Sequence, residues 1–209
     1  MPPKSSILDI GPGFGYFARI CIENGHDYFA IEPSNSLRCY LKSNFGYRLI
    51  NSWTPPIPIK DNSLDMLFAN QILEHMPDYA HVLKFLMEVK RVLRPGGIAC
   101  FIVPDYMFCG RHFFNCDPTH EYIFTTLRME RLSKDSGLKI IVNRSSALSI
   151  KKSWFSPILK FIAKLSLNFF SLSLIVMLFE LIKRESLLYK IQKQFMGGIL
   201  TILQKEDAT

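Results

Sequence analysis

The chain has 209 residues, of which 48% are hydrophobic and 21% are charged. It is therefore long enough to bury the core of one domain, and this composition excludes a globally disordered protein. The formal net charge is +7, but residues 151–196 carry eight basic and two acidic side chains, which leaves +1 for the rest of the chain. A charge this small removes the main argument for a nucleic-acid-binding domain, and no nucleic-acid partner is expected.

Apolar runs and capped amphipathic stretches alternate along the first 150 residues. The expected strands are residues 6–10, 27–32, 47–51, 64–70, 98–104 and 138–143. The expected helices are residues 14–25, 34–46, 79–93 and 125–137. Ser34 or Asn35 is placed to cap the second helix, and Gly46 is placed to end it. A proline-rich loop at 52–63 replaces a further helix, and residues 104–121 are expected to form a long aromatic loop.

A last apolar run, residues 197–205, predicts a seventh strand, whose direction relative to its neighbours is left open. The alternation of strands and helices predicts an α/β fold with a Rossmann-like, doubly wound, seven-stranded and mostly parallel sheet. Residues 1–150 and 197–209 would form one domain, with residues 151–196 as a helical insertion before the last strand. In such a sheet, ligands bind at the carboxyl ends of the strands.

Three glycines follow the first strand at every second position, in the stretch LDIGPGFG. Gly11, Gly13 and Gly15 let the backbone come close to a ligand at the start of the first helix. A dinucleotide site would have the spacing G-x-G-x-x-G, whereas this chain has G-x-G-x-G, which argues against a nicotinamide-dependent enzyme. The shorter turn, with Asp9 before it, suits a cationic or zwitterionic adenosine derivative rather than a pyrophosphate.

Glu32 ends the second strand, in the stretch AIEPS. A carboxylate at this place can accept hydrogen bonds from both ribose hydroxyls of a nucleoside. The alternative is a solvated residue at a strand end, and neither Glu32 nor the glycine turn decides the function alone.

Four stretches, in this order, carry a resemblance to a known family: LDIGPGFGYFA, AIEPS, IKDNSLDMLFANQILEHMPD and EVKRVLRPGGIACFIVP. Over about residues 7–143 and the last strand, the chain resembles the class I S-adenosylmethionine-dependent methyltransferases, and within them the type 11 methyltransferase domain. The resemblance implies S-adenosylmethionine as the cofactor. It also implies that the methyl group passes by in-line displacement to a small-molecule or lipid-linked acceptor. The alternative is a non-catalytic scaffold or partner subunit of the same fold with weakened cofactor binding.

The resemblance also assigns the cofactor-binding residues. Gly11, Gly13 and Gly15 would pack under the methionine part of the cofactor. Asp9 would orient the turn and the amino acid, and Glu32 would hold the ribose. Together these residues would form one cradle across the ends of the first two strands.

Two further segments would complete this cofactor site. The end of the fourth strand, at Asn70 and Gln71, would line the sulfonium side. The family usually places an Asp after the third strand, where it receives the adenine amino group, but this chain has LINSWTPPIP there. Asn51 or Ser52 can still hydrogen-bond to the base, and Trp53 can stack on it. The missing carboxylate favours the scaffold alternative, and the intact glycine turn opposes it.

A nitrogen or hydroxyl acceptor must lose a proton during methyl transfer, and a neutral histidine suits this task near neutral pH. The stretch LEHMPD places Glu74 and His75 just after the fourth strand, and DPTH places Asp117 and His120 in the aromatic loop. Relatives often carry a similar DPTH run, so the resemblance puts it on the substrate side. We expect His120, His75 and Asp117 to be the catalytic residues. Structural alternatives are that His75 caps or packs against the next helix, and that Asp117 is a turn residue before Pro118.

The five cysteines form no C-x-x-C pair and no signal peptide opens the chain, so they are expected to be reduced cytoplasmic thiols. Cys109, His112, Cys116 and His120 have the spacing C-x2-H-x3-C-x3-H. This spacing fits no common zinc module, and the local sequence indicates a loop. No metal site is therefore expected.

The insertion, residues 151–196, is apolar and flanked by basic residues. Its longest uncharged run, residues 165–179, would span roughly 22 Å as a helix, less than the ~30 Å of the hydrocarbon core of a membrane. A transmembrane helix is therefore not expected. The alternatives left open are a helical lid over the pocket, an interfacial hairpin on an anionic membrane, and a dimer contact. The protein is expected to be cytoplasmic, either free or peripheral at a membrane.

Overall fold

The computed structural model describes residues 2, 4–46, 48–147, 165–166 and 197–207. The predicted insertion at 151–196 lies outside the described residues, apart from 165–166. The three alternatives for its role therefore stay predictions. In the part of the chain that the structure describes, no helix is long and apolar enough to cross a membrane.

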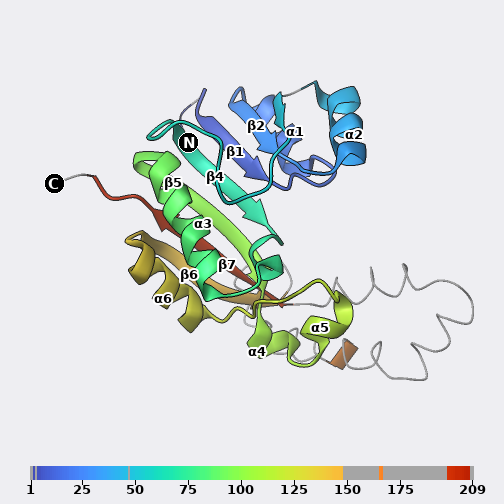
Figure 1. The fold of residues 1–209 in the computed structure, drawn as a ribbon, viewed down its shortest axis with the longest axis vertical. Helices are drawn as coiled ribbons and strands as arrows, with labels where there is room; N and C mark the ends of the chain where they lie inside the picture. Colours follow the sequence, from blue (N-terminus) through green and yellow to red (C-terminus); the bar gives the residue numbers. More distant parts are fainter. Residues whose placement is uncertain (1, 3, 47, 148–164, 167–196, 208–209) are drawn as a thin grey trace, which may run out of the picture.

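A seven-stranded sheet runs through the middle of the molecule (Figure 1). Its strands are β1 (Ser6–Ile10), β2 (Asp27–Ile31), β3 (Arg48–Ile50), β4 (Leu64–Asn70), β5 (Leu93–Pro104), β6 (Lys139–Ala147) and β7 (Gly197–Gln204). They lie in the order β3-β2-β1-β4-β5-β7-β6. Strands β1 to β5 are parallel to one another, and β7 runs antiparallel to both β5 and β6. The predicted α/β fold with a mostly parallel sheet is therefore confirmed, and the direction of the last strand is now known.

Helices connect the strands of the sheet. The α-helices among the described residues are α1 (Tyr16–Glu23), α2 (Asn35–Phe45), α3 (Tyr79–Val92), α4 (Tyr106–Cys109), α5 (His112–Cys116) and α6 (Thr126–Ser136). A short 3₁₀ helix, η1 (Leu73–His75), follows β4 almost directly. Ser34 caps α2, because its side chain accepts a hydrogen bond from the Leu37 N–H. Gly46, at a φ of +65°, ends the same helix as expected.

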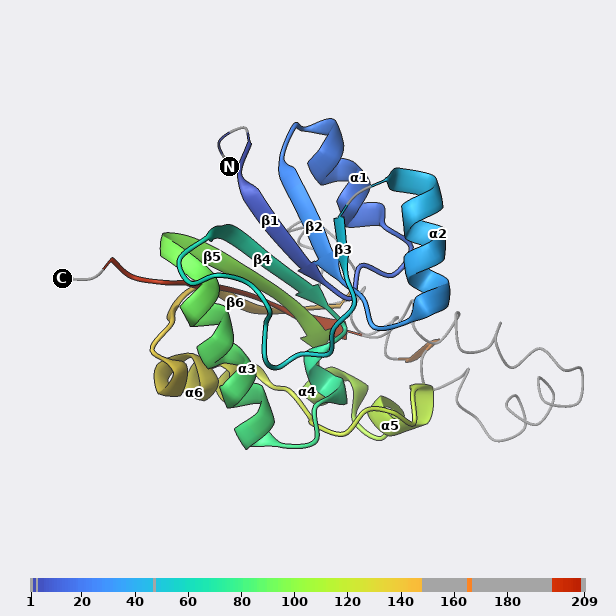
Figure 2. The same ribbon diagram turned by 45° about the horizontal axis from the view of Figure 1, so that its top comes forward.

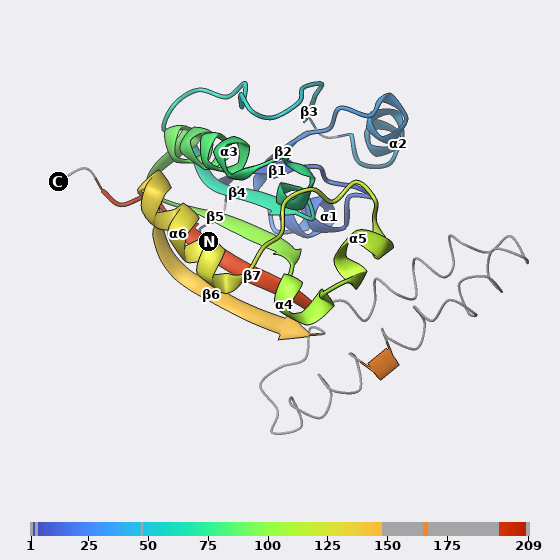
Figure 3. The same ribbon diagram turned by 60° about the horizontal axis from the view of Figure 1, so that its bottom comes forward.

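The sheet is covered on both faces. Helix α1 packs on one face, where Ala18 and Cys21 meet Ile7 and Tyr28 of the strands. Helices α3 and α6 cover the opposite face and form the main core (Figure 3). Their buried side chains in this core are Val82, Phe85, Leu86, Val89, Val92, Met129 and Leu132. The α3 members recur every three or four residues, which is the spacing of an amphipathic helix, so the sequence pattern directly explains this layer.

Two predicted segments differ from the structure. The stretch 104–121, expected to be a loop, contains the short helices α4 and α5. Asp105 caps α4 by accepting a hydrogen bond from the Met107 N–H, and a four-residue helix is too short to show helical periodicity in the sequence. Strand β5 starts at Leu93, earlier than predicted, because Leu93 already pairs with β4 and the RPGG segment bulges before the regular pairing resumes.

Candidate active site

The carboxyl ends of β1, β2 and β4 lie at one edge of the sheet, because these strands are parallel neighbours (Figure 2). Ile10 at the end of β1 pairs with Ile31 at the end of β2, and the Gly11 N–H donates to the Ile31 carbonyl at 2.9 Å. The structure therefore brings the glycine turn, Glu32 and the end of β4 at Asn70 to the same edge. The loop that follows β3 reaches this edge as well.

Each glycine of the turn has a left-handed backbone. Gly11, Gly13 and Gly15 have φ values of +68°, +54° and +78°, a conformation that side chains with a Cβ adopt only with strain. A Cβ on Gly11 would lie 2.4 Å from Ile72 Cδ1, and one on Gly15 would lie 2.7 Å from the Phe45 ring. A Cβ on Gly13 would meet no atom of the described residues within 4 Å. A side chain at Gly11 or Gly15 would therefore displace Ile72 or Phe45, whereas Gly13 borders open space where a ligand can approach the backbone.

Asp9 lies under this turn, at the end of β1, and is almost fully buried. Burial raises the pKa of its carboxyl group from 3.8 to about 7. A hydrogen bond that the Tyr28 hydroxyl donates to Asp9 Oδ2 at 2.6 Å lowers the pKa, and the charge of Glu32 raises it. With a pKa near neutrality, Asp9 can ionise when a cationic group binds close by.

Glu32 is buried at the start of the β2–α2 connection. Its Oε1 accepts a hydrogen bond from the Ser34 N–H at 2.8 Å. The Arg38 guanidinium donates to the Glu32 carbonyl at 2.9 Å and to the Pro33 carbonyl at 2.6 Å. These bonds fix the backbone around Glu32, so its carboxylate has a defined place just after β2, the strand that pairs with β1 before the glycine turn.

The residues predicted to meet the adenine follow β3. Asn51 is exposed, and Ser52 donates a hydrogen bond from its hydroxyl to the Trp53 carbonyl at 2.9 Å. The Trp53 side chain is 80% exposed, so its ring is accessible to a ligand. At the end of β4, Asn70 is exposed, and Gln71 has a left-handed φ of +58° while its N–H donates to β5. Such a conformation costs about 1–3 kcal/mol and is often found at functional sites.

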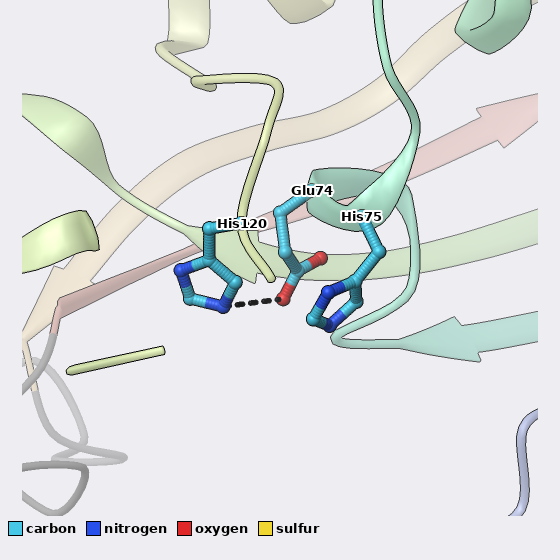
Figure 4. Close-up of side chains that lie close together, drawn as sticks. All are labelled: Glu74, His75 and His120. Carbon is cyan, nitrogen blue, oxygen red and sulfur yellow. Dashed lines mark ion pairs between the residues drawn. The ribbon is translucent and has the colours of Figure 1, made fainter. Parts of the chain in front are cut away.

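Two segments far apart in the sequence lie together beyond the end of β4, where the sequence predicts the acceptor side. Helix η1 carries Glu74 and His75, and the loop after α5 carries Asp117 and His120. The His120 Nε2 lies 3.9 Å from Glu74 Oε1 and 3.9 Å from Asp117 Oδ2. The side chains of Glu74, His75 and His120 point toward one another, and the two imidazole centroids are 5.1 Å apart (Figure 4). We call Glu74, His75 and His120 the acceptor-side cluster.

Backbone hydrogen bonds join these two segments. The Glu74 carbonyl accepts hydrogen bonds from the N–H groups of Glu121 and Tyr122 at 2.8 and 3.0 Å. The cluster therefore does not depend on side-chain contacts alone, since the 3₁₀ helix and the loop are held together directly. Its place follows from Ile72, which packs against the glycine turn and precedes Glu74 by only two residues.

The histidine orientations follow from their hydrogen bonds. His120 is buried, and its Nδ1 lies 2.8 Å from the Phe113 carbonyl, which can only accept, so Nδ1 carries the proton and Nε2 faces the carboxylates. His75 is exposed, and its Nδ1 lies 3.1 Å from the Thr119 carbonyl and 3.0 Å from Thr119 Oγ1. Thr119 Oγ1 in turn donates to Asp117 Oδ1 at 2.6 Å. The loop thus orients both imidazoles.

Asp117 has both a structural and a local electrostatic role. Its Oδ1 also accepts from the Thr119 N–H at 3.0 Å, the bond expected of a turn residue before proline. Burial raises the pKa of Asp117, but the Thr119 hydrogen bonds and the neighbouring histidines outweigh it and hold the pKa below its ordinary value. Glu74, by contrast, is placed by the sequence beside His75 after the fourth strand but is not among the residues expected to be catalytic. Its only signal was an acidic residue directly after a predicted strand, and its complete burial became evident in the structure.

Comparisons with known proteins point to one family. Residues 8–101 match the family model described as a methyltransferase domain. A curated relative from Mycobacterium sp. (strain KMS), described as "Uncharacterized methyltransferase", is 30% identical over 99 residues, which cover 47% of this chain and 38% of the relative. The chain therefore spans well under half the length of the curated relatives that it matches.

Solved structures share the fold of this chain. The phosphoethanolamine N-methyltransferase 2 of Haemonchus contortus, in complex with S-adenosyl-L-methionine, is 17% identical with a TM-score of 0.67, over 99% of this chain and 50% of that one. The [4+2]-cyclase SpnF is also 17% identical with a TM-score of 0.67, over 100% of this chain and 77% of that one. Identities this low show the fold and leave the reaction to be argued from the site.

Proposed function

We propose that the protein transfers the methyl group of S-adenosylmethionine to a small-molecule or lipid-linked acceptor, since residues 8–101 match the model of a methyltransferase domain. One observation carries the proposal. The turn at residues 11–15, which follows β1, leaves open space beside Gly13, and the buried carboxylate of Glu32 follows the neighbouring strand β2. A side chain would fill that space, so the cradle fits a ligand that lies against bare backbone.

The residues at this edge match the parts of the cofactor. Gly13 admits the methionine part, and Asp9, with its pKa near 7, becomes the counter-charge of the cationic amino group. Glu32 accepts hydrogen bonds from the ribose hydroxyls. The loop after β3 meets the adenine through Asn51 or Ser52, with Trp53 stacked on it. When bound, the cofactor supplies a methyl group activated by the positive sulfonium.

The sulfonium side and the acceptor side meet at the end of β4. Asn70 and Gln71 line the sulfonium side, and the next few residues lead into η1. His75, His120 and Asp117 face the acceptor and promote loss of its proton, which aligned methyl transfer to oxygen or nitrogen requires.

One observation favours a second candidate function, a non-catalytic scaffold of the same fold. No carboxylate follows β3 in the stretch INSWTPPIP, so the adenine lacks the partner that the family usually provides. Direct measurement of cofactor binding separates the two candidates. The proposed enzyme binds the cofactor and its demethylated product, and the scaffold binds neither.

The test is calorimetry and thermal shift with S-adenosylhomocysteine on the full chain, with NAD in parallel. Gly13→Ala is the diagnostic variant and Gly25→Ala its control, since both glycines have positive φ values and open space around the added Cβ, and Gly25 lies outside the site. We expect S-adenosylhomocysteine to stabilise the wild type and Gly25→Ala but not Gly13→Ala, and NAD to have no effect. A folded wild type that gives no heat with S-adenosylhomocysteine would refute the proposal.

A further inference from the structure

We propose that the acceptor-side cluster, Glu74, His75 and His120, binds a divalent metal ion of the zinc class. Each of the three residues offers one ligand atom, and these atoms all lie within 4.8 Å of one another. Glu74 and His120 are buried, and His75 closes the cluster from the exposed side (Figure 4). The inference concerns the site itself, so it stands whether or not the chain binds S-adenosylmethionine.

The spacing of the cluster fits an ion better than direct hydrogen bonds. His120 Nε2 lies 3.9 Å from both Glu74 Oε1 and Asp117 Oδ2, which is too long for a hydrogen bond. Zinc binds nitrogen and oxygen at about 2.0–2.2 Å, so two ligands of a tetrahedral ion lie about 3.4 Å apart. Side-chain rotations of roughly half an ångström to one ångström would therefore bring the three ligand atoms to coordination distance.

The histidine orientation supports the same inference. Histidines that bind a metal usually donate the other ring N–H to a backbone carbonyl or a carboxylate, which fixes the tautomer and the direction of the ligating nitrogen. His120 has this arrangement, because Nδ1 donates to the Phe113 carbonyl and Nε2 is directed to the cluster. His75 is held by the carbonyl and hydroxyl of Thr119. Both rings are thus oriented by one loop before an ion arrives.

The donor set indicates which ions fit. Two imidazoles and one carboxylate form a set found at catalytic zinc sites, where the fourth position is left for water or substrate. Imidazole also suits other divalent transition metals, whereas magnesium and calcium prefer oxygen ligands. Asp117 lies at the same distance from His120 as Glu74 does, but it is not among the residues whose ligand atoms all lie within 4.8 Å of one another, so it borders the cluster and is not counted as a ligand.

This site differs from the Cys/His set considered in the sequence analysis, where no metal was expected. Of Cys109, His112, Cys116 and His120, only His120 belongs to the cluster. The other two ligands come from η1, more than forty residues earlier, so the spacing of the loop motif alone could not indicate them.

The chemical role of the ion rests on the proposed function. With the ion bound, the lone pairs of His75 and His120 are used in coordination, so the ion takes over from these histidines the task of promoting proton loss. An acceptor hydroxyl or thiol bound to the ion loses its proton to solvent more readily, because the cation stabilises the anion that forms. The lone pair of that oxygen or sulfur then forms the bond to the methyl carbon. The bond between this carbon and the sulfonium breaks, its electron pair stays on sulfur, and neutral S-adenosylhomocysteine leaves. One proton is released in each transfer, and the ion is not consumed.

The test is metal binding by the full chain after removal of metals with a chelator. Zn²⁺ is titrated by calorimetry, and Co²⁺ is added as a spectroscopic probe whose visible absorption reports four- or five-coordination. We expect one ion per chain in the wild type. Glu74→Gln and His75→Asn should weaken Zn²⁺ binding at least tenfold, and Mg²⁺ in excess should not compete. Because His75 is exposed, His75→Asn is expected to keep the fold even where the buried Glu74→Gln does not.

The matched control is His81→Asn, which removes a histidine on the surface of α3 that pairs with Asp78 at 2.8 Å. It should bind Zn²⁺ as the wild type does. The proposal is overturned if the folded wild type binds no stoichiometric Zn²⁺, or if His75→Asn and His81→Asn bind it equally well. Calorimetry with S-adenosylhomocysteine on the same samples distinguishes the two proposals. Cofactor binding without Zn²⁺ binding refutes the metal site alone, and Zn²⁺ binding without cofactor binding refutes the proposed function alone.

Discussion

Replacing Asp9 with Asn should make the ligand-free protein more stable at pH 8. Asp9 is only 2% exposed, and burial raises its pKa from 3.8 to about 7, with a further contribution from the charge of Glu32. The folded protein therefore keeps this proton up to about neutral pH, whereas the unfolded chain loses it near pH 4. Asn has nearly the same size, carries no charge, and can accept the hydrogen bond from Tyr28.

The sign and the magnitude follow from proton linkage. Between pH 4 and pH 7 the folded state binds more protons at this position than the unfolded state, so the contribution of Asp9 to stability falls as the pH rises. A pKa raised from 3.8 to about 7 corresponds to an upper value of about 4 kcal/mol. The advantage of Asp9→Asn over the wild type should therefore be near zero at pH 4 and grow toward that value at pH 8.

Urea unfolding of the wild type and Asp9→Asn between pH 5 and pH 8.5 measures this difference directly. Groups that titrate equally in both proteins cancel when the two free energies of unfolding are subtracted. Asp27→Asn is the control, because Asp27 is exposed and forms a surface ion pair with Arg48. The reasoning is refuted if the advantage of Asp9→Asn does not change with pH. Asp9→Asn should bind S-adenosylmethionine more weakly than the wild type, because the substitution removes the proposed counter-charge of the amino group.

Three further substitutions test the cofactor site. Glu32→Gln should weaken S-adenosylhomocysteine binding about tenfold or more in calorimetry, because hydrogen bonds to a charged group contribute about 1.5–3 kcal/mol. Unchanged affinity would place the ribose elsewhere. Trp53→Ala should change the free energy of unfolding by less than about 0.5 kcal/mol, since the side chain is 80% exposed, yet weaken S-adenosylhomocysteine by about 1–3 kcal/mol through lost stacking. Equal affinities in calorimetry would rule out the stacked adenine. Gly15→Ala should lower the free energy of unfolding by more than the cost of a left-handed alanine, which is about 1–2 kcal/mol. The extra loss is expected because the added Cβ would lie 2.7 Å from the Phe45 ring. A loss no larger than that of Gly25→Ala in urea unfolding would contradict this packing argument.

Much of the fold could be predicted because its signals are local. Each parallel strand is a short apolar run, and α3 repeats its apolar residues at helical spacing, so the order of elements follows from the sequence. The family resemblance stated from the motifs is confirmed by the match over residues 8–101. The direction of β7 could not be predicted, since its pairing with β5 and β6 depends on contacts across a long stretch of chain.

The glycine-turn side of the candidate site could be predicted from the sequence better than the acceptor-side cluster could. The glycine turn and Glu32 follow strands that are neighbours in a Rossmann-like sheet, so their common place could be predicted, whereas their binding roles stay predictions. The meeting of Glu74 with His120 depends on how the loop after α5 folds back to η1, and no sequence periodicity reports such a contact. The sequence predicts His75, Asp117 and His120 from the chemistry of proton removal and from the family's DPTH run, and their catalytic roles also stay predictions.

The short segment from Ile72 to His75 has a consequence for redesign. Ile72 packs against Gly11 of the glycine turn, and two and three residues later the same segment contributes Glu74 and His75 to the acceptor-side cluster. A substitution in this segment would alter both the glycine turn and the acceptor-side cluster. Under the proposed function, selection for a new acceptor here would therefore also change the affinity for the cofactor.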